Sequence, residues 1–190
     1  MTKAELRKKY LQKRQQLSEA EYLHLNRLLC EHFFSSIDLS FLKVVHTFLP
    51  IREKKEPDTW LILDRIRREF PHIRISLPKL NVDGKMENIY FEGMHQLEKS
   101  KWGIEEPRQG VPTPVEKIDL VVVPLLCLDD QGNRVGYGKG YYDTFLASCK
   151  SSCQKVGISF FSTSETIDDL NEQDVPLDAI LTPEGFRSFK

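Results

Sequence analysis

The sequence has 190 residues, of which 40% are hydrophobic and 29% are charged, and its formal net charge is -1. This balance is typical of an ordinary soluble globular protein, and the length suggests one domain with a sizeable core. It also gives no reason to expect nucleic acid or an acidic membrane as a partner.

The N-terminus and the cysteines predict a cytoplasmic protein. Charged residues from Lys3 onward leave no apolar region for a secretory signal, and no apolar run approaches the length of a membrane span. The four cysteines form no C-x-x-C pair, and no histidine lies near them at zinc-ligand spacing. We expect reduced thiols in a monomer that binds neither nucleic acid nor a membrane.

Two capping boxes predict two helices at the start of the chain. Thr2 and Glu5 form the first box, and Ser18 and Glu21 form the second. Apolar residues follow each box at helical spacing, namely Leu6, Tyr10 and Leu17 after the first and Tyr22, Leu25, Leu28, Leu29 and Phe33 after the second.

Strands and one helix are predicted for the middle of the chain. The apolar run 44–49 before Pro50 predicts a strand, and apolar residues at helical spacing over 60–70 predict a helix. Two further strands are expected at 73–77 and 86–91. A turn at 83–84, an Asp-Gly pair, separates them.

The last third of the chain predicts the class of fold. The continuous apolar run 120–126 is typical of a strand that is buried on both faces of a parallel sheet. Further strands are expected at 156–161 and within 174–182. The alternation of strands and helices predicts a single α/β domain over residues 1–190, with a mainly parallel, Rossmann-like open sheet flanked by helices.

The loop after the buried strand has an unusual composition. Residues 134–143 read Arg-Val-Gly-Tyr-Gly-Lys-Gly-Tyr-Tyr-Asp. Alternating glycines leave backbone N–H groups uncovered and permit positive φ, so the loop can form a nest of donors around an anion. Arg134 and Lys139 add positive charge, and a carboxylate at Asp143 beside phosphates suggests Mg²⁺. Open α/β sheets bind ligands at such βα loops.

Two better-known phosphate motifs do not fit this loop. A P-loop requires Ser or Thr after Gly-Lys, but Gly140 follows Lys139. A dinucleotide fingerprint requires glycine three residues after Gly138, where the chain has Tyr141. A glycine-rich connecting turn with solvated cations is the alternative interpretation.

The pattern Arg-x-Gly-x-Gly-x-Gly-Tyr-Tyr-Asp resembles the signature of the 5-formyltetrahydrofolate cyclo-ligases, also called methenyltetrahydrofolate synthetases. The resemblance extends from Lys3 to Thr182. It implies that ATP and Mg²⁺ are used to convert 5-formyltetrahydrofolate to 5,10-methenyltetrahydrofolate, with release of ADP and phosphate. Two alternatives stay open: a non-catalytic folate- or nucleotide-binding module of the same fold, and an ATP-dependent ligase of the family that acts on a different amide.

The resemblance implies an ATP site. Lys3 and Arg7 match a family pair that contacts the nucleotide phosphates and the folate, although on spacing alone a solvated basic face of the first helix is the simpler interpretation. The implied ATP-binding residues are Lys3, Arg7, Arg134, Gly136, Tyr137, Gly138, Lys139, Gly140, Tyr141 and Tyr142. Arg7, Arg134 and Lys139 would be catalytic because they neutralise phosphate charge.

The resemblance also implies a folate site and a metal site. Glu56 matches the acid that binds the pterin, and a carboxylate suits the neighbouring 2-amino and N3–H donors of that ring. The implied substrate-binding residues are Arg7, Leu49, Glu56, Trp102, Tyr137 and Tyr141. Asp143 and Asp178 would hold Mg²⁺, although a strand-end acid facing water is the alternative for Asp178.

Overall fold

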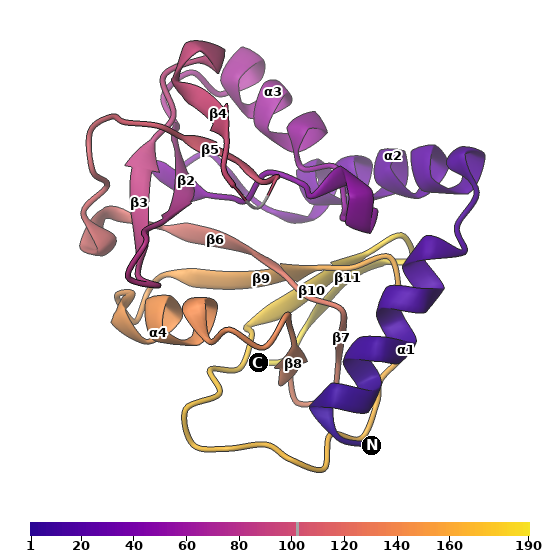
Figure 1. Ribbon diagram of the computed structural model, residues 1–190. Helices are drawn as coiled ribbons and strands as arrows, with labels where there is room; N and C mark the ends of the chain where they lie inside the picture. Colours follow the sequence, from indigo (N-terminus) through magenta and orange to yellow (C-terminus); the bar gives the residue numbers. More distant parts are fainter. Residues whose placement is uncertain (102) are drawn as a thin grey trace.

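An open sheet forms the centre of the computed structural model, which describes residues 1–101 and 103–190 (Figure 1). Among these residues, seven strands form one sheet in the order β11-β10-β9-β6-β1-β2-β3. Their bounds are β1 Val44–His46, β2 Arg74–Leu80, β3 Met86–Tyr90, β6 Leu120–Pro124, β9 Gln154–Ile158, β10 Ala179–Thr182 and β11 Gly185–Ser188. The predicted single α/β domain is therefore built around one sheet.

The sheet is mainly parallel, as predicted. β2, β1, β6, β9 and β10 pair with one another in parallel, while the edge strands β3 and β11 are antiparallel to their neighbours. The first four residues of β6 are buried, which agrees with the continuous apolar run in the sequence. The chain order runs outward in one direction from β1 and in the other from β6, so the topology switches between these two strands.

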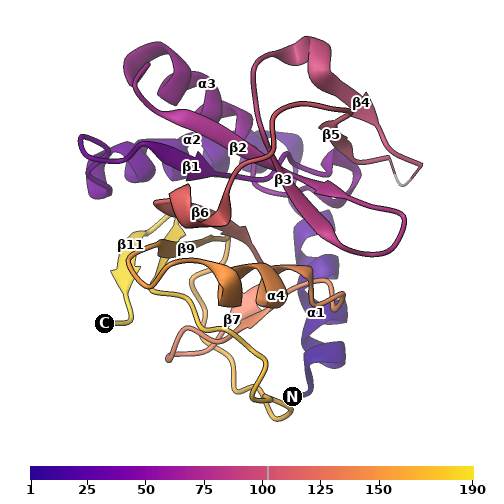
Figure 2. The same ribbon diagram turned by 90° about the vertical axis from the view of Figure 1, so that its left-hand side faces the viewer.

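Helices cover both faces of the sheet (Figures 1 and 2). α2 (Glu19–Ser36) and α3 (Trp60–Glu69) pack on one face, and α4 (Tyr141–Ser148) packs on the other. α1 (Lys3–Gln15) lies beside the sheet and packs on the small hairpin of β7 (Cys127–Leu128) and β8 (Arg134–Val135). Both predicted capping boxes are formed at the starts of α1 and α2.

The remaining elements are short. β4 (Leu97–Lys99) and β5 (Glu105–Pro107) form a separate antiparallel pair. Three 3-10 turns lie at η1 (Arg52–Lys54), η2 (Met94–Gln96) and η3 (Val115–Lys117). All four cysteines are unpaired, and within the described ranges no helix is long and apolar enough to cross a membrane.

A buried histidine on β1 makes the stability of the fold depend on pH. The side chain of His46 is 0% exposed, and neither ring nitrogen has a hydrogen-bond partner in the described part of the chain. Burial lowers the pKa of His46 to about 3. Because histidine in an unfolded chain titrates near about 6.5, the unfolded state binds one more proton between about pH 3 and 6.5. The contribution of neutral His46 to the free energy of unfolding is thus fully present above about pH 6.5 and is lost as the pH falls toward 3.

We therefore expect His46→Leu to flatten the acid side of the stability profile. The free energy of unfolding of the unmodified protein should fall from pH 7 to pH 5 by about 2 kcal/mol more than that of the variant. Urea unfolding at the two pH values measures this difference. His24→Gln, at an exposed histidine on α2, serves as the control. An equal pH dependence in both proteins would contradict the assignment.

Candidate active site

Two loops meet at the topological switch between β1 and β6. In open α/β sheets, ligands bind in the crevice beside the carboxyl ends of the strands at such a point. The loop after β1 carries Glu56, and the loop after β6 carries the glycine-rich segment 134–140. The fold therefore brings together two predicted parts of the site that are far apart in the sequence.

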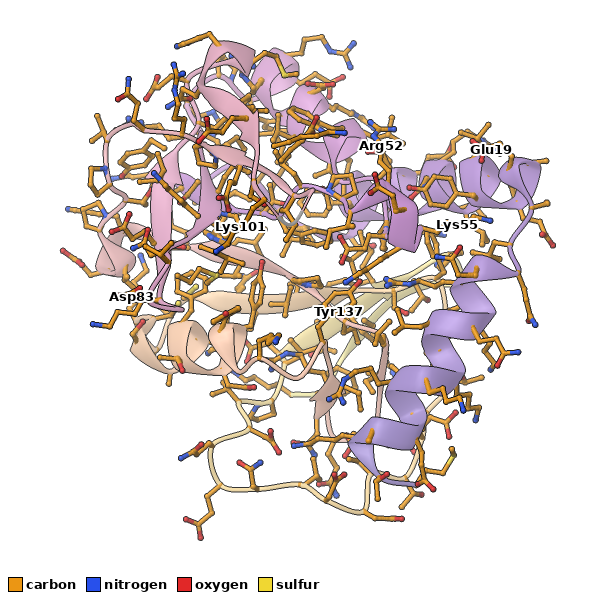
Figure 3. The ribbon with its side chains drawn as sticks, in the orientation of Figure 1. Glu19, Arg52, Lys55, Asp83, Lys101 and Tyr137 are labelled. Carbon is orange, nitrogen blue, oxygen red and sulfur yellow. The ribbon has the colours of Figure 1, made fainter. Side chains whose placement is uncertain are left out.

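A chain of hydrogen bonds joins these loops to α1. The Tyr137 hydroxyl donates to Oε1 of Glu56 at 2.6 Å and accepts from Nη2 of Arg14 at 2.5 Å. The backbone N–H of Ile51 donates to the other Glu56 oxygen, Oε2, at 2.6 Å. Figure 3 shows Tyr137 near the centre of the molecule, below the segment that carries Arg52 and Lys55. The acid predicted to bind a pterin thus directly contacts the loop predicted to bind phosphates.

The environment of Glu56 opposes its charge and also stabilises it. Only 3% of the side chain is exposed, and this burial raises the pKa of Glu56 above its usual range. The hydrogen bonds from Tyr137 and Ile51, and the positive charges of Arg14 and Lys54, act in the opposite direction. An ionised carboxylate has about four acceptor sites, of which two are used here. The other two have no hydrogen-bond partner in the described part of the chain.

The glycine loop presents free backbone donors. Gly138 and Gly140 adopt the left-handed conformation, with φ of 84° and 74°. In the described part of the chain, the amide N–H groups of residues 136–140 donate to no acceptor. Gly140 is also the N-cap of α4, and it supplies no side chain to cap the helix. Such an arrangement favours an anion, because both the exposed donors and the helix start carry partial positive charge.

The predicted cations of α1 lie against this loop and the segment beside it. Nε of Arg7 donates to the carbonyl oxygen of Gly136 at 2.8 Å. A Cβ atom at Gly138 would lie 2.9 Å from Nη2 of Arg7, so a larger residue there would displace the guanidinium. Nζ of Lys3 pairs with Asp174 at 2.5 Å. Lys139 is exposed and forms no ion pair with any described residue.

Arg134 and Asp143 form a partly buried ion pair at the start of α4. Nη2 of Arg134 lies 2.7 Å from Oδ1 of Asp143, and the two side chains are 6% and 30% exposed. The backbone N–H of Val175 donates to the same oxygen at 3.0 Å. Oδ2 of Asp143 has no hydrogen-bond partner among residues 1–101 and 103–190. Asp143 therefore orients Arg134 with one oxygen, and no described residue donates to the other.

The contacts of Asp178 differ from those expected of a second metal ligand. Its Oδ2 accepts from the backbone N–H of Lys155 at 2.8 Å, and its Oδ1 pairs with Nζ of Lys190 at 2.5 Å. It precedes β10 at the amino end of the parallel strands, whereas ligands bind beside their carboxyl ends. No group of three or more His, Cys, Asp or Glu residues suited to a metal ion occurs in the described part of the chain. The local role of Asp178 is to join β9, β10 and the C-terminus.

The other predicted ligand-binding residues have different surroundings. Leu49 is buried in the core between the sheet and the helices α2 and α3. The hydroxyl of Tyr141 reaches toward the turn between β2 and β3, where a Cβ atom at Gly84 would lie 3.9 Å away. Tyr142 packs edge-on to His46, and its buried hydroxyl has no partner in the described ranges. Trp102, a predicted substrate-binding residue, lies outside the described residues.

Arg14 is a further candidate site residue, which the predicted motifs do not include. Its side chain is only 3% exposed, and it contacts Tyr137 at the centre of the site. The signal was present, because Arg14 follows Arg7 by seven residues and therefore lies on the same face of α1. Spacing alone does not show that Arg14 is buried, because basic residues near a helix end are usually solvated.

The chain is similar to known proteins over most of its length. Residues 1–183 match the sequence model of the "5-formyltetrahydrofolate cyclo-ligase family". A probable 5-formyltetrahydrofolate cyclo-ligase of Schizosaccharomyces pombe is 31% identical over 148 residues, which cover 69% of this chain and 71% of that protein. The 5-formyltetrahydrofolate cyclo-ligase of Mycoplasma pneumoniae is 27% identical over 190 residues, covering 97% and 100%. The NMR structure of Aquifex aeolicus 5,10-methenyltetrahydrofolate synthetase superposes with a TM-score of 0.85 at 31% identity, covering 100% of this chain and 94% of that chain.

Proposed function

The chain belongs to the 5-formyltetrahydrofolate cyclo-ligase family, and on this premise we propose that it converts 5-formyltetrahydrofolate to 5,10-methenyltetrahydrofolate with consumption of ATP. The observation that carries the proposal is the hydrogen bond of 2.6 Å between Tyr137 and Glu56. It supports a single site in which a phosphate-binding loop adjoins an acceptor suited to a pterin.

The reaction requires an activated amide. The N5-formyl carbonyl is a poor electrophile, and its oxygen is a poor leaving group. Transfer of the γ-phosphoryl group of ATP to that oxygen gives an imidate-like phosphate and ADP. N10 then attacks the formyl carbon and releases its proton to water, the carbon–oxygen bond breaks, and phosphate leaves as the ring closes. The protein contributes mainly positioning and charge stabilisation, as in other phosphoryl transfers.

The glycine loop and the cations around it would bind the nucleotide phosphates. The free N–H groups of residues 136–140 would donate to phosphate oxygens, and Lys139 and Arg7 would neutralise their charge. Arg134, which Asp143 orients, would act from the start of α4. Lys3 pairs with Asp174 and would exchange this partner for a phosphate oxygen when the nucleotide binds.

The donors present fit Mg²⁺ accompanied by ATP. Mg²⁺ usually takes one or two carboxylates together with phosphate oxygens and water. Oδ2 of Asp143 is the oxygen that would hold it, because Oδ1 is already engaged by Arg134 and Val175. When bound, Mg²⁺ neutralises charge on the transferring phosphates.

The folate would be placed by Glu56 and the neighbouring tyrosines. The two unused acceptor sites of the Glu56 carboxylate match the adjacent 2-amino and N3–H donors of a pterin. Tyr137 and Tyr141 extend from the phosphate loop toward the β1 loop and the turn between β2 and β3. A substrate between these groups would hold its formyl oxygen near the γ-phosphate.

A spectroscopic assay tests the proposal directly. Purified protein with Mg²⁺, ATP and 5-formyltetrahydrofolate should produce the methenyl chromophore, together with equal amounts of ADP and phosphate. Omission of ATP, or addition of a chelator, should abolish the product, and added Mg²⁺ should restore it. Binding of folate and ATP without turnover would support a non-catalytic module. Absence of 5-formyltetrahydrofolate binding would favour a ligase that acts on a different amide.

A further inference from the structure

We propose that Arg14 is a positioning residue of the folate site, which acts through Tyr137 to maintain a negative, correctly oriented carboxylate at Glu56. The inference rests on the proposed function, because it assumes that Glu56 receives the pterin. It assigns a role in substrate affinity to a residue that neither touches the phosphates nor belongs to the glycine loop.

The first observation is the isolation of the Arg14 charge. The side chain is 3% exposed, its Nε has no hydrogen-bond partner, and it forms no ion pair with any described residue. Its one polar side-chain contact in the described ranges is the bond of 2.5 Å from Nη2 to the Tyr137 hydroxyl. A buried guanidinium is costly unless a negative charge compensates it. The hydroxyl leads directly to such a charge, because it donates to Glu56.

The second observation is that Arg14 is the least screened cation facing Glu56. The titratable and charged side chains around Glu56 come from five parts of the chain: Arg14 of α1, Tyr22 of α2, Lys54 of η1, Tyr137 of the glycine loop and Tyr142 of α4. Only two of them, Arg14 and Lys54, are cations. Lys54 is exposed, with Nζ 4.4 Å from the centroid of the Tyr137 ring, so water and salt screen its charge. The buried charge of Arg14 is screened much less.

The positive charge of Arg14 affects pterin binding because the pterin requires Glu56 to be ionised. Adjacent N–H donors require an ionised carboxylate, which accepts hydrogen bonds on both oxygens. A protonated Glu56 would present an O–H donor to one of them. Burial already raises the pKa of Glu56, and the Arg14 charge opposes that rise. Loss of the charge should therefore convert part of the Glu56 population to a form that cannot pair with the ring.

The test measures the affinity for 5-formyltetrahydrofolate by calorimetry between pH 6 and pH 9, without ATP. We expect Arg14→Gln to shift the midpoint of the pH dependence to higher pH. Below the new midpoint, each pH unit should weaken binding about tenfold, and affinity should recover as the pH rises. Arg14→Lys retains the charge, so its midpoint should stay close to that of the unmodified protein.

Further variants separate this role from a structural one. Glu56→Gln cannot titrate at this position, so its affinity should not follow the pH dependence, whether or not Arg14 is present. That affinity should be at least about tenfold below the affinity of the unmodified protein with Glu56 ionised. Tyr137→Phe should shift the midpoint in the same direction as Arg14→Gln, and the double variant should shift it less than the sum of the two. Arg27→Gln, at a guanidinium that is 61% exposed, is the control and should leave the midpoint unchanged.

Clear outcomes would overturn the inference. An equal loss of affinity for Arg14→Gln at all pH values would make Arg14 a purely structural residue, as would a lower melting temperature with an unchanged midpoint. If Arg14→Gln does not fold, an unshifted midpoint in Tyr137→Phe overturns the inference instead. Failure of the unmodified protein to bind 5-formyltetrahydrofolate at any pH would contradict the proposed function itself, and is distinguishable because it does not depend on Arg14.

Discussion

We expect Lys139→Ala to reduce turnover by about 10²-fold or more, while the stability of the protein stays unchanged. Lys139 lies in the glycine loop between Gly138 and Gly140, and its ammonium forms no ion pair with any described residue. Its charge is thus available to a phosphate that gains negative charge on the bridging oxygen during transfer. Because the side chain is exposed, its removal leaves no cavity.

Steady-state rates at saturating ATP and 5-formyltetrahydrofolate, together with thermal unfolding, measure both parts of this prediction. Lys117→Ala is the matched control, because Lys117 is another exposed lysine that lies in η3, outside the glycine loop. A fall in kcat with a smaller change in the KM for ATP would indicate a contact that strengthens in the transition state. A wild-type rate for Lys139→Ala would instead identify the lysine as a solvated part of a connecting turn.

The sequence predicts the fold where local signals and burial agree. The capping boxes at Thr2 and Ser18 define the starts of two helices because they satisfy backbone donors with side chains only three residues away. The apolar run 120–126 predicts a strand buried on both faces, and β6 (Leu120–Pro124) is that strand at the centre of the sheet. The hairpin of β7 and β8 and the pair of β4 and β5 have only two or three residues per strand, so tertiary contacts rather than local pattern decide them.

The sequence predicts the segments of the candidate site but not the contacts between them. The sequence singles out the glycine loop and Glu56 as candidates, but the hydrogen bond between Tyr137 and Glu56 spans 81 positions and follows from the sheet order. The buried position of Arg14 depends on the packing of α1 against the β7–β8 hairpin, which no spacing rule contains. The contacts of Asp178 likewise depend on where the C-terminal Lys190 returns.

The second large effect is expected for Asp143→Asn, which should lower activity by about 10²-fold and raise the Mg²⁺ concentration needed for half-maximal rate. The substitution removes the negative charge of Asp143, whose Oδ2 accepts no hydrogen bond from any described residue. It also leaves the Arg134 guanidinium, which is 6% exposed, without its counter-charge. Because breaking a buried pair is destabilising, the melting temperature should fall as well.

The corresponding change at Asp178 separates these two effects. Asp178→Asn keeps an amide oxygen that can accept from the Lys155 N–H, and it loses an ion pair whose lysine is 73% exposed. The Asp178 side chain is 18% exposed, but the exposed lysine leaves the pair accessible to water, and such pairs contribute about 0–1 kcal/mol, so stability should change little. From these contacts we expect the wild-type dependence on Mg²⁺ and nearly the wild-type rate.

Activity measured against Mg²⁺ concentration at saturating ATP, on variants shown to be folded, decides between the two carboxylates. If Asp143→Asn lowers the melting temperature but keeps the wild-type Mg²⁺ dependence, Asp143 serves only to orient Arg134. If Asp178→Asn raises the Mg²⁺ requirement as Asp143→Asn does, the resemblance to the family was the better guide to Asp178, and the loop before β10 must move when ATP binds. Folate binding without ATP should stay intact in both variants, because Glu56 contacts neither carboxylate.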